Sequence, residues 1–258
     1  MILEVKGLCA GYGKTEILHD VSFSLEAGTM TGLLGANGSG KTTLMKSLCG
    51  LIPHTGQTLL NGMPMERMTP RTLARNCSLI SQRSGITIDL SVLDVVLMGF
   101  NARLGLLEYP TKQMRETALR ALDAVGLQGM GERNFQTLSE GQKQLCILAR
   151  TLVTEGSLLL MDEPESALDF FGRYKLLLEV KRFLGSRRAA LVTLHDPQLA
   201  LNCCDRLLLL QEGRVLDTLE PSRDSLEDME RKLTKVYGEL TLLRVQNRSG
   251  ESQLVLVR

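Results

Sequence analysis

The feature that most constrains the fold is the stretch GANGSGKT at residues 35–42. It fits the pattern G-x-x-x-x-G-K-[ST], which a chain of this length and average composition matches by chance on the order of once in a hundred. The apolar segment TMTGLL precedes it, and an apolar pattern with helical spacing follows at Leu44, Leu48 and Leu51. A phosphate-binding loop requires this order of strand, loop and helix. The stretch therefore predicts an α/β fold built around a phosphate-binding loop.

The residue types in this loop account for its spacing. Gly35, Gly38 and Gly40 permit backbone dihedral angles that turn several amides toward one point. Lys41 brings a cation to the β- and γ-phosphates of a nucleotide, and the hydroxyl of Thr42 can bind Mg²⁺. The N-terminus of the following helix adds a favourable potential for an anion. We expect a nucleoside triphosphate as the ligand, rather than a glycine-rich turn without one.

Strand-like and helix-like segments alternate along most of the chain, which predicts a largely parallel, covered sheet. From about residue 91 the alternation stops, because SVLDVVLMGF and TKQMRETALRALDAVGL are both helical by period and no strand pattern separates them. An amphipathic helix, SRDSLEDMERKLTKVYG, begins a tail at about residue 221, and two short alternating segments follow it. We expect a core domain at residues 1–220, with a helical subdomain inserted at about 91–150, and a small C-terminal α+β appendage at 221–258.

The charge balance and the cysteines argue against some classes of protein. Lysine and arginine number 30 against 29 aspartate and glutamate, and a net charge of +1 argues against bulk binding of nucleic acid. The six cysteines form no C-x-x-C pair and are expected to be reduced thiols of a cytosolic protein. The segment MILEVKGL lacks the apolar core of a signal peptide, and no apolar run approaches the roughly 20 residues that span a bilayer. We expect that the chain does not cross a membrane by itself.

Two carboxylates follow the buried-strand pattern SLLLMD at residues 157–162. Asp162 is suited to the coordination shell of Mg²⁺, and Glu163 could orient an attacking water or accept its proton. Both roles require the metal and the γ-phosphate to lie at the carboxyl end of this strand, where open α/β sheets bind ligands. Alone, a strand ending in Asp-Glu-Pro would indicate a plain turn. The phosphate loop upstream favours the catalytic interpretation.

The segment LSEGQ, residues 138–142, stands directly before another apolar helical pattern. Ser139 and Gln142 have the spacing of a capping box, in which each side chain binds the backbone N–H of the other residue. The amides of such a helix start can also hold a phosphate, so the two interpretations are compatible. Glu140 suits the helix dipole but would repel a triphosphate. We therefore expect its side chain to point away from any phosphate at this helix.

These motifs occur in the order found in ATP-binding-cassette (ABC) ATPases, and the chain resembles the separate nucleotide-binding subunit of an ABC transporter over about residues 1–220. GANGSGKTT matches the Walker A loop, LLLMDEP the Walker B segment, SALD the D-loop and LSEGQ the family signature, which is usually LSGGQ. Tyr12 in AGYGK matches the aromatic that stacks on adenine, Gln82 in LISQRS the Q-loop glutamine, and His195 in TLHD the switch histidine. Each of these three, taken alone, would be interpreted as structural.

The resemblance implies a P-loop NTPase of the ABC ATPase type, in which two copies of the chain bind ATP and Mg²⁺ head to tail. The implied catalytic residues are Glu163, His195 and Gln82. The implied metal ligands are Thr42, Gln82 and Asp162. The implied ATP contacts are Tyr12, Gly35, Asn37, Gly38, Ser39, Gly40, Lys41, Thr42 and Thr43 on one copy, and Ser139, Gly141 and Gln142 on the other.

The same resemblance implies partners and a location. A polytopic membrane permease would bind the ATPase dimer at the cytoplasmic face of the membrane, where the dimer is peripheral. An extracytoplasmic substrate-binding protein would be an indirect partner, and nucleic acid would not be one. Three positions depart from the family: Glu140 replaces the usual glycine, Glu165 the usual threonine, and Leu145 a basic residue often found there. None removes an expected ligand of ATP, so they bear on turnover and partner fit.

Two segments narrow the resemblance. SVLDVVLMGF and TLHDPQLALNCCDRLLLLQEGRVL are most similar to ATPases of importers for iron-siderophore, haem or cobalamin cargo. That subgroup often has Gly-Arg and a proline where this chain has Gly99-Phe100-Asn101, and importers of other small solutes share most of the remainder. The alternative is a single-cassette ATPase of soluble machinery such as iron-sulfur cluster assembly. An inactive regulatory subunit would be expected to lack Glu163 or Lys41, and both are present.

Overall fold

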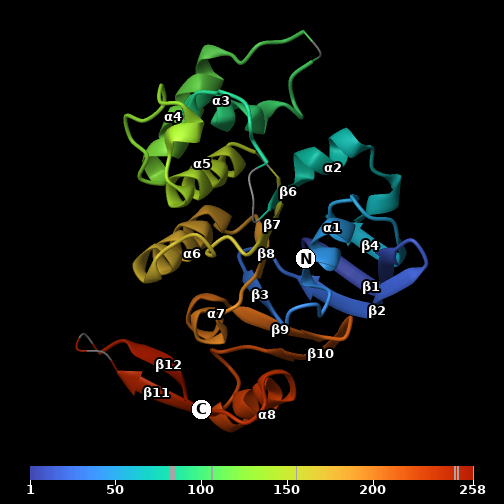
Figure 1. The fold of residues 1–258 in the computed structure, drawn as a ribbon. Coiled ribbons are helices and arrows are strands. Elements are labelled where there is room, and N and C mark those ends of the chain that lie inside the picture. Colours follow the sequence, from blue (N-terminus) through green and yellow to red (C-terminus); the bar gives the residue numbers. More distant parts are fainter. Residues whose placement is uncertain (82–84, 106, 155, 247, 249, 258) are drawn as a thin grey trace.

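The computed structural model describes residues 1–81, 85–105, 107–154, 156–246, 248 and 250–257 (Figure 1). The strands of its central sheet are β3 (Met30–Leu34), β6 (Cys77–Ile80), β7 (Leu158–Asp162), β8 (Ala189–Thr193), β9 (Arg206–Gln211) and β10 (Arg214–Leu219). Their order is β10-β9-β3-β8-β7-β6, and β10 pairs antiparallel with β9 while the other pairs are parallel. β3, β7 and β8 are buried along their whole length, because both faces of the sheet are covered. The predicted α/β fold with a largely parallel sheet is confirmed.

A second, antiparallel sheet lies beside the central one. Its strands, in the order β2-β1-β4-β5, are β1 (Leu3–Tyr12), β2 (Thr15–Leu25), β4 (His54–Leu60) and β5 (Met63–Pro64). Helix α1 (Lys41–Leu48) packs between the sheets, and its Leu44, Met45 and Leu48 are fully buried in a cluster that contains residues of both. The sheets therefore hold the helix that follows the phosphate loop from two sides.

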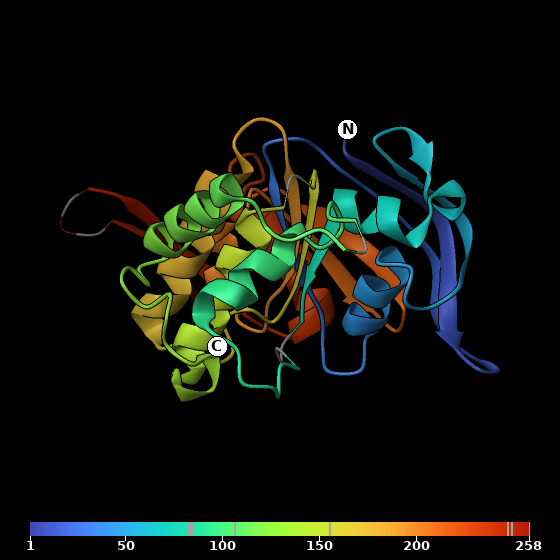
Figure 2. The ribbon, with the colours of Figure 1, turned by 90° about the horizontal axis from the view of Figure 1, so that it is seen from above.

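The segment between β6 and β7 is helical, as its periodicity predicted. After α2 (Pro70–Asn76) and β6, the structure contains α3 (Val92–Leu97), α4 (Lys112–Ala124) and α5 (Glu140–Leu152). Short 3₁₀ turns lie in this segment at Met98–Phe100 and Phe135–Thr137, and another lies before α2 at Met65–Arg67. Helices α3, α4 and α5 pack on one another around the buried side chains of Phe100 and Phe135. Figures 1 and 2 both show this group away from α1, on the other side of the central sheet.

The last part of the chain packs against the edge of the core formed by β9 and β10. Helices α6 (Phe170–Leu184) and α7 (Pro197–Cys203) precede it in the chain, and it consists of α8 (Leu226–Tyr237), β11 (Thr241–Gln246) and β12 (Ser252–Val257). Strands β11 and β12 form an antiparallel hairpin that extends from the body of the molecule (Figures 1 and 2). The domain boundary at residues 220 and 221 stays a prediction. Among the described residues, no helix is long and apolar enough to cross a membrane.

Candidate functional site

The N-terminus of α1 has the features of an anion-binding site. Gly40 precedes the helix with a φ of +105°, and a Cβ atom there would lie 2.8 Å from Leu18 Cδ2, so glycine is required. No side chain caps α1, and its first turn has no acidic residue. The first N–H groups of a helix have no partner within the helix. At this uncapped end they are left to a ligand, and the helix dipole favours a negatively charged one.

Lys41 is the first residue of α1, and its side chain folds back against the phosphate loop. The residue is 6% exposed, and its Nζ donates hydrogen bonds to the carbonyl oxygens of Gly35 at 2.8 Å and Ala36 at 3.1 Å. Burial lowers the pKa of Lys41, while the charges of Glu163 and Asp162 act to raise it. The ammonium group thus binds two carbonyl oxygens of the loop, and a phosphate would supply a charged and therefore stronger partner.

A cavity of about 300 Å³ opens over this loop. It is lined by Tyr12, Ile17, Asn37, Gly38, Gly40, Lys41, Thr42, Thr43 and Glu163. The resemblance had implied all of these as ATP contacts except Glu163, which it implied as catalytic, and Ile17, a β2 residue across the turn from Tyr12. The signal that could have found Ile17 is its place on the strand directly after the AGYGK turn. The structure therefore brings Tyr12, the phosphate loop and Glu163 to one cavity, and His195 is not among the described residues that line it.

The ends of β7 and β8 are joined by a polar network. Thr193 Oγ1 donates a hydrogen bond to Asp162 Oδ1 at 2.8 Å and accepts one from the backbone N–H of Glu163 at 2.8 Å. Asp162 is 8% exposed and Thr193 is fully buried, so one hydroxyl fixes the Asp162 carboxylate and the backbone of Glu163. Sequence reasoning missed Thr193, because a threonine at the end of a strand carries no specific signal.

The side chains of Glu163 and His195 are in close contact. His195 Nε2 lies 2.6 Å from Glu163 Oε1, and the Glu163 side chain is 16% exposed. Glu163 has a φ of +52°, which is strained for a non-glycine residue and costs about 1–3 kcal/mol. Strain of this kind persists where surrounding contacts enforce it and is frequent at functional sites. Two of the three predicted catalytic residues, Glu163 and His195, are therefore in contact, while the third, Gln82, lies outside the described residues.

Gly35 of the phosphate loop lies close to Leu210 of β9 and to Ser39 of the same loop. A Cβ on Gly35 would lie 2.3 Å from the carbonyl oxygen of Leu210 and 2.6 Å from Ser39 Oγ, so only glycine fits. Ser39 Oγ is buried and has no hydrogen-bond partner in the part of the chain that the structure describes. Both residues belong to the predicted set of ATP contacts, but neither lines the described cavity. Their role as contacts stays a prediction.

The predicted capping box at the start of α5 is present. The backbone N–H of Gln142 donates to Ser139 Oγ at 3.2 Å, and the N–H of Ser139 donates to Gln142 Oε1 at 3.1 Å. The Glu140 carboxylate pairs with Lys143 Nζ at 2.8 Å and is 75% exposed. Ser139, Gly141 and Gln142 are not among the described residues that line the cavity over α1. Within one copy of the chain, the two sets of predicted ATP contacts stay apart.

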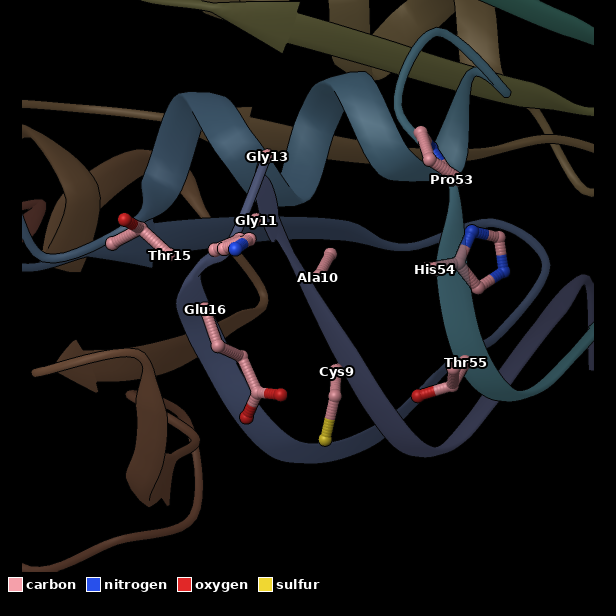
Figure 3. A pocket seen from close by; sticks show the side chains of 10 residues that line it. Cys9, Ala10, Gly11, Gly13, Thr15, Glu16, Pro53, His54 and Thr55 are labelled. Atoms are coloured by element: carbon pink, nitrogen blue, oxygen red, sulfur yellow. The ribbon is translucent and has the colours of Figure 1, made fainter.

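A second cavity of about 300 Å³ lies against the antiparallel sheet, close to the turn that carries Tyr12 (Figure 3). Two of its polar side chains are already paired: Glu16 binds His19 Nδ1 at 2.7 Å, and His54 Nε2 lies 3.1 Å from Thr58 Oγ1. Among the described residues, no group of three or more His, Cys, Asp or Glu side chains could hold a metal ion. We assign no chemistry to this cavity.

The chain is similar to known ABC transporter proteins in both sequence and structure. The family model for ABC transporters matches residues 18–166. A haemin import ATP-binding protein, HmuV, of Pseudomonas putida is 39% identical over 219 residues, which cover 83% of this chain and 84% of the relative. An iron chelatin transport ATP-binding protein of Helicobacter pylori is 34% identical over 218 residues, covering 83% and 86%. The structure of a metal-chelate type ABC transporter in an inward-facing conformation is 25% identical with a TM-score of 0.83, covering 100% and 98%.

Proposed function

The chain belongs to the ABC transporter family of ATP-hydrolysing subunits, and we propose that it powers an importer of haem or another iron chelate through a separate permease. The observation that carries the proposal is the cavity that joins Tyr12, the phosphate loop and Glu163. The names of the haemin and iron chelatin relatives support this class of cargo, which agrees with the expected iron-siderophore, haem or cobalamin group. A permease-bound ATPase would be peripheral at the cytoplasmic face of the membrane, and the substrate-binding protein would be an indirect partner.

ATP would bind with its phosphates at the start of α1. The uncapped N–H groups of α1 and the loop amides would hold the β- and γ-phosphates, and Lys41 would exchange the carbonyls of Gly35 and Ala36 for phosphate oxygens. Tyr12 is 50% exposed at the cavity edge, which leaves its ring available to stack on adenine. Binding would therefore use the N–H groups of α1 that no side chain caps, the Lys41 ammonium group and the ring of Tyr12.

Thr42 and Asp162 fit a magnesium ion by the chemistry of their donors. Both offer oxygen ligands, which Mg²⁺ prefers, and the negative charge of Asp162 acts on the neighbouring Lys41. Bound Mg²⁺ would neutralise charge on the β- and γ-phosphates. Gln82 is a further proposed ligand. Asp162 itself would be kept in place by its hydrogen bond from Thr193.

Glu163 would orient the attacking water and accept its proton. Its carboxylate reaches the cavity that Lys41 and Thr42 line, and the ring of His195 holds it from the other side. A carboxylate offers about four lone-pair sites, so Glu163 can contact His195 and a water at the same time. His195 would thus fix the direction of the base, which is the positioning role that hydrolysis of a phosphoanhydride requires.

Two copies of the chain would close the site. Ser139, Gly141 and Gln142 are exposed or half-buried at the start of α5, and this helix lies far from α1 in both views of the ribbon (Figures 1 and 2). A second copy, placed head to tail, would bring these groups to the γ-phosphate. ATP would then hold the dimer together, and hydrolysis would release it.

Replacement of Glu163 by glutamine tests the catalytic assignment. Glu163→Gln keeps the size of the side chain but removes the base, so we expect ATP hydrolysis to slow by about 10²–10⁴-fold. ATP binding and ATP-dependent dimerisation should persist. Phosphate release and size-exclusion chromatography with MgATP measure both. Turnover close to that of the unchanged protein would contradict the role of Glu163.

Co-purification from detergent-solubilised membranes tests the importer assignment. The tagged Glu163→Gln protein with MgATP should retain a polytopic membrane protein, identified by mass spectrometry. A tagged Lys41→Ala protein, which should not form the ATP-bound dimer, is the matched control for dimer-dependent partners. Recovery of soluble partners alone, such as proteins of iron-sulfur cluster assembly, would contradict the importer and favour the alternative function.

A further inference from the structure

Glu165 is a buried carboxyl beside the catalytic pair. The residue follows Pro164 in the turn after β7 and is 2% exposed. Its Oε1 accepts a hydrogen bond from the backbone N–H of His195 at 3.3 Å. His195 itself lies just after β8, the neighbouring strand, so this contact links the turn after β7 to the turn after β8. Threonine is usual at this position in the family that the sequence resembles, and its side chain is shorter than that of glutamate.

The second carboxyl oxygen of Glu165 has a different environment from the first. Oε2 is buried and has no hydrogen-bond partner among the described residues. Burial raises the pKa of Glu165, whereas the N–H groups of Glu165 and His195 act to lower it. A buried polar atom without a partner destabilises the fold, and few such atoms occur in native structures. Burial of the Glu165 carboxyl group is therefore costly to stability.

His195 is held at two points by two different glutamates. Its ring contacts Glu163 at 2.6 Å, and its backbone N–H contacts Glu165 at 3.3 Å. The backbone of Glu163 is fixed by its hydrogen bond to Thr193. With the backbone of His195 also fixed, the imidazole keeps its place against the Glu163 carboxylate.

We propose that Glu165 is a positioning residue for ATP hydrolysis, which holds the backbone of His195 so that the ring stays in contact with Glu163. The proposal rests on the proposed roles of Glu163 and His195. Glu165 acts through His195 and does not touch ATP. Its contribution is therefore to the rate of the chemical step, and the affinity for ATP is left almost unchanged.

Three variants separate this role from general stability. Glu165→Met keeps the length of the side chain but removes the acceptor for the His195 N–H. Glu165→Gln retains an acceptor oxygen, and Glu165→Thr, the usual family residue, has an acceptor that is too short to reach. We expect kcat to fall about tenfold or more in the Met and Thr variants with KM almost unchanged, because small misplacements of catalytic groups are costly. The Gln variant should retain most of the rate.

A double-mutant cycle then tests whether the effect passes through His195. In a His195→Ala background, Glu165→Met should cause no further loss of kcat. If Glu165→Met and His195→Ala lowered kcat by independent factors, so that the double variant lost the product of the two, the proposal would be overturned. A Glu165→Gln variant as slow as Glu165→Met would also overturn it. If the Met variant does not fold, the comparison of Thr with Gln decides the same question.

Imidazole NMR resonances give a readout that is independent of hydrolysis. The chain has three histidines, His19, His54 and His195, so the ring signals can be assigned by single substitutions. The Met and Thr variants should shift the His195 ring signal and leave the other two in place, whereas the Gln variant should leave all three close to their positions. An unmoved His195 signal would overturn the proposal. A normal rate in Glu163→Gln would instead contradict the proposed catalytic function and would leave this NMR result as it is.

Discussion

Gly213, in the turn between β9 and β10, connects the phosphate loop to strand β2. Its N–H donates to the carbonyl of Ser39 at 3.0 Å, and its own carbonyl accepts from the N–H of His19 at 2.9 Å. Its φ is +72°, and a Cβ atom there would lie 1.9 Å from the carbonyl oxygen of Ile17. Since Ile17 lines the cavity over the phosphate loop and Ser39 belongs to that loop, Gly213 fixes the spacing of two parts of the candidate site.

Gly213→Ala should therefore destabilise the protein and weaken ATP binding. Gly129 has the same φ of +72° but no atom within 4 Å of the place where a Cβ would be, so Gly129→Ala is a matched control for the backbone strain alone. The control should lose about 1 kcal/mol, and Gly213→Ala clearly more, because a backbone carbonyl must move. Urea unfolding and nucleotide titration measure both. Equal losses in the two variants would show that the contact with Ile17 does not matter.

The start of α5 combines a helix cap with a proposed ATP contact, and Ser139 takes part in both. Its hydroxyl caps the helix through the N–H of Gln142, and the same hydroxyl would face the γ-phosphate of a second copy. Aspartate is as good a cap as serine, but its charge would repel a phosphate. Ser139→Asp should keep the stability of the isolated subunit and abolish ATP-dependent dimerisation.

Ser139→Ala should lose about 0.5–2 kcal/mol of stability through the missing cap. Ser225 caps α8 in the same way, accepting from the N–H of Asp228 at 3.1 Å, so Ser225→Ala is the control for a lost cap outside the site. It should cost a similar stability and leave dimerisation intact. Both measurements are made in the Glu163→Gln background with MgATP. Normal dimerisation of Ser139→Asp would contradict the phosphate contact.

Elements with a strong local pattern were predictable, and those that depend on distant partners were not. The loop at residues 35–42 and the strand at 157–162 carry their own flanking signals, and both are where the sequence places them. The strand patterns of β1, β2 and β4 were local, but the pairing of β1 with β4 depends on residues far apart in the chain, so no local signal placed these strands in a separate sheet. β10 was missed, because its charged residues and half-buried pattern are those of an edge strand.

The same division holds within the site. The motif residues of the cavity were predicted because their types and order are specific. Glu165 was visible only as a departure from the family, since no local pattern reveals that its side chain is buried against His195. Thr193 was likewise invisible until the register of β7 and β8 placed it beside Asp162.

At the scale of the whole molecule, the C-terminal appendage shares the core of the rest of the chain. Met229 and Leu233 of α8 are fully buried in a cluster that also contains residues of β3, β7 and α5. Lys232 Nζ donates to the carbonyl of Thr218 at 2.9 Å, and Asn202 of α7 exchanges two hydrogen bonds with Leu254 of β12, at 2.8 Å and 2.9 Å. A segment attached in this way should unfold together with the core.

Leu233→Ala tests this cooperativity. The substitution removes buried methyl groups and should cost about 2–5 kcal/mol. Because the appendage and core share one cluster, the whole urea transition followed by far-UV circular dichroism should move to lower denaturant as a single step. Leu243 of β11 is 47% exposed, and Leu243→Ala should change stability by less than about 0.5 kcal/mol. A separate early transition in Leu233→Ala, with the main one unmoved, would show that residues 221–258 fold as an independent unit.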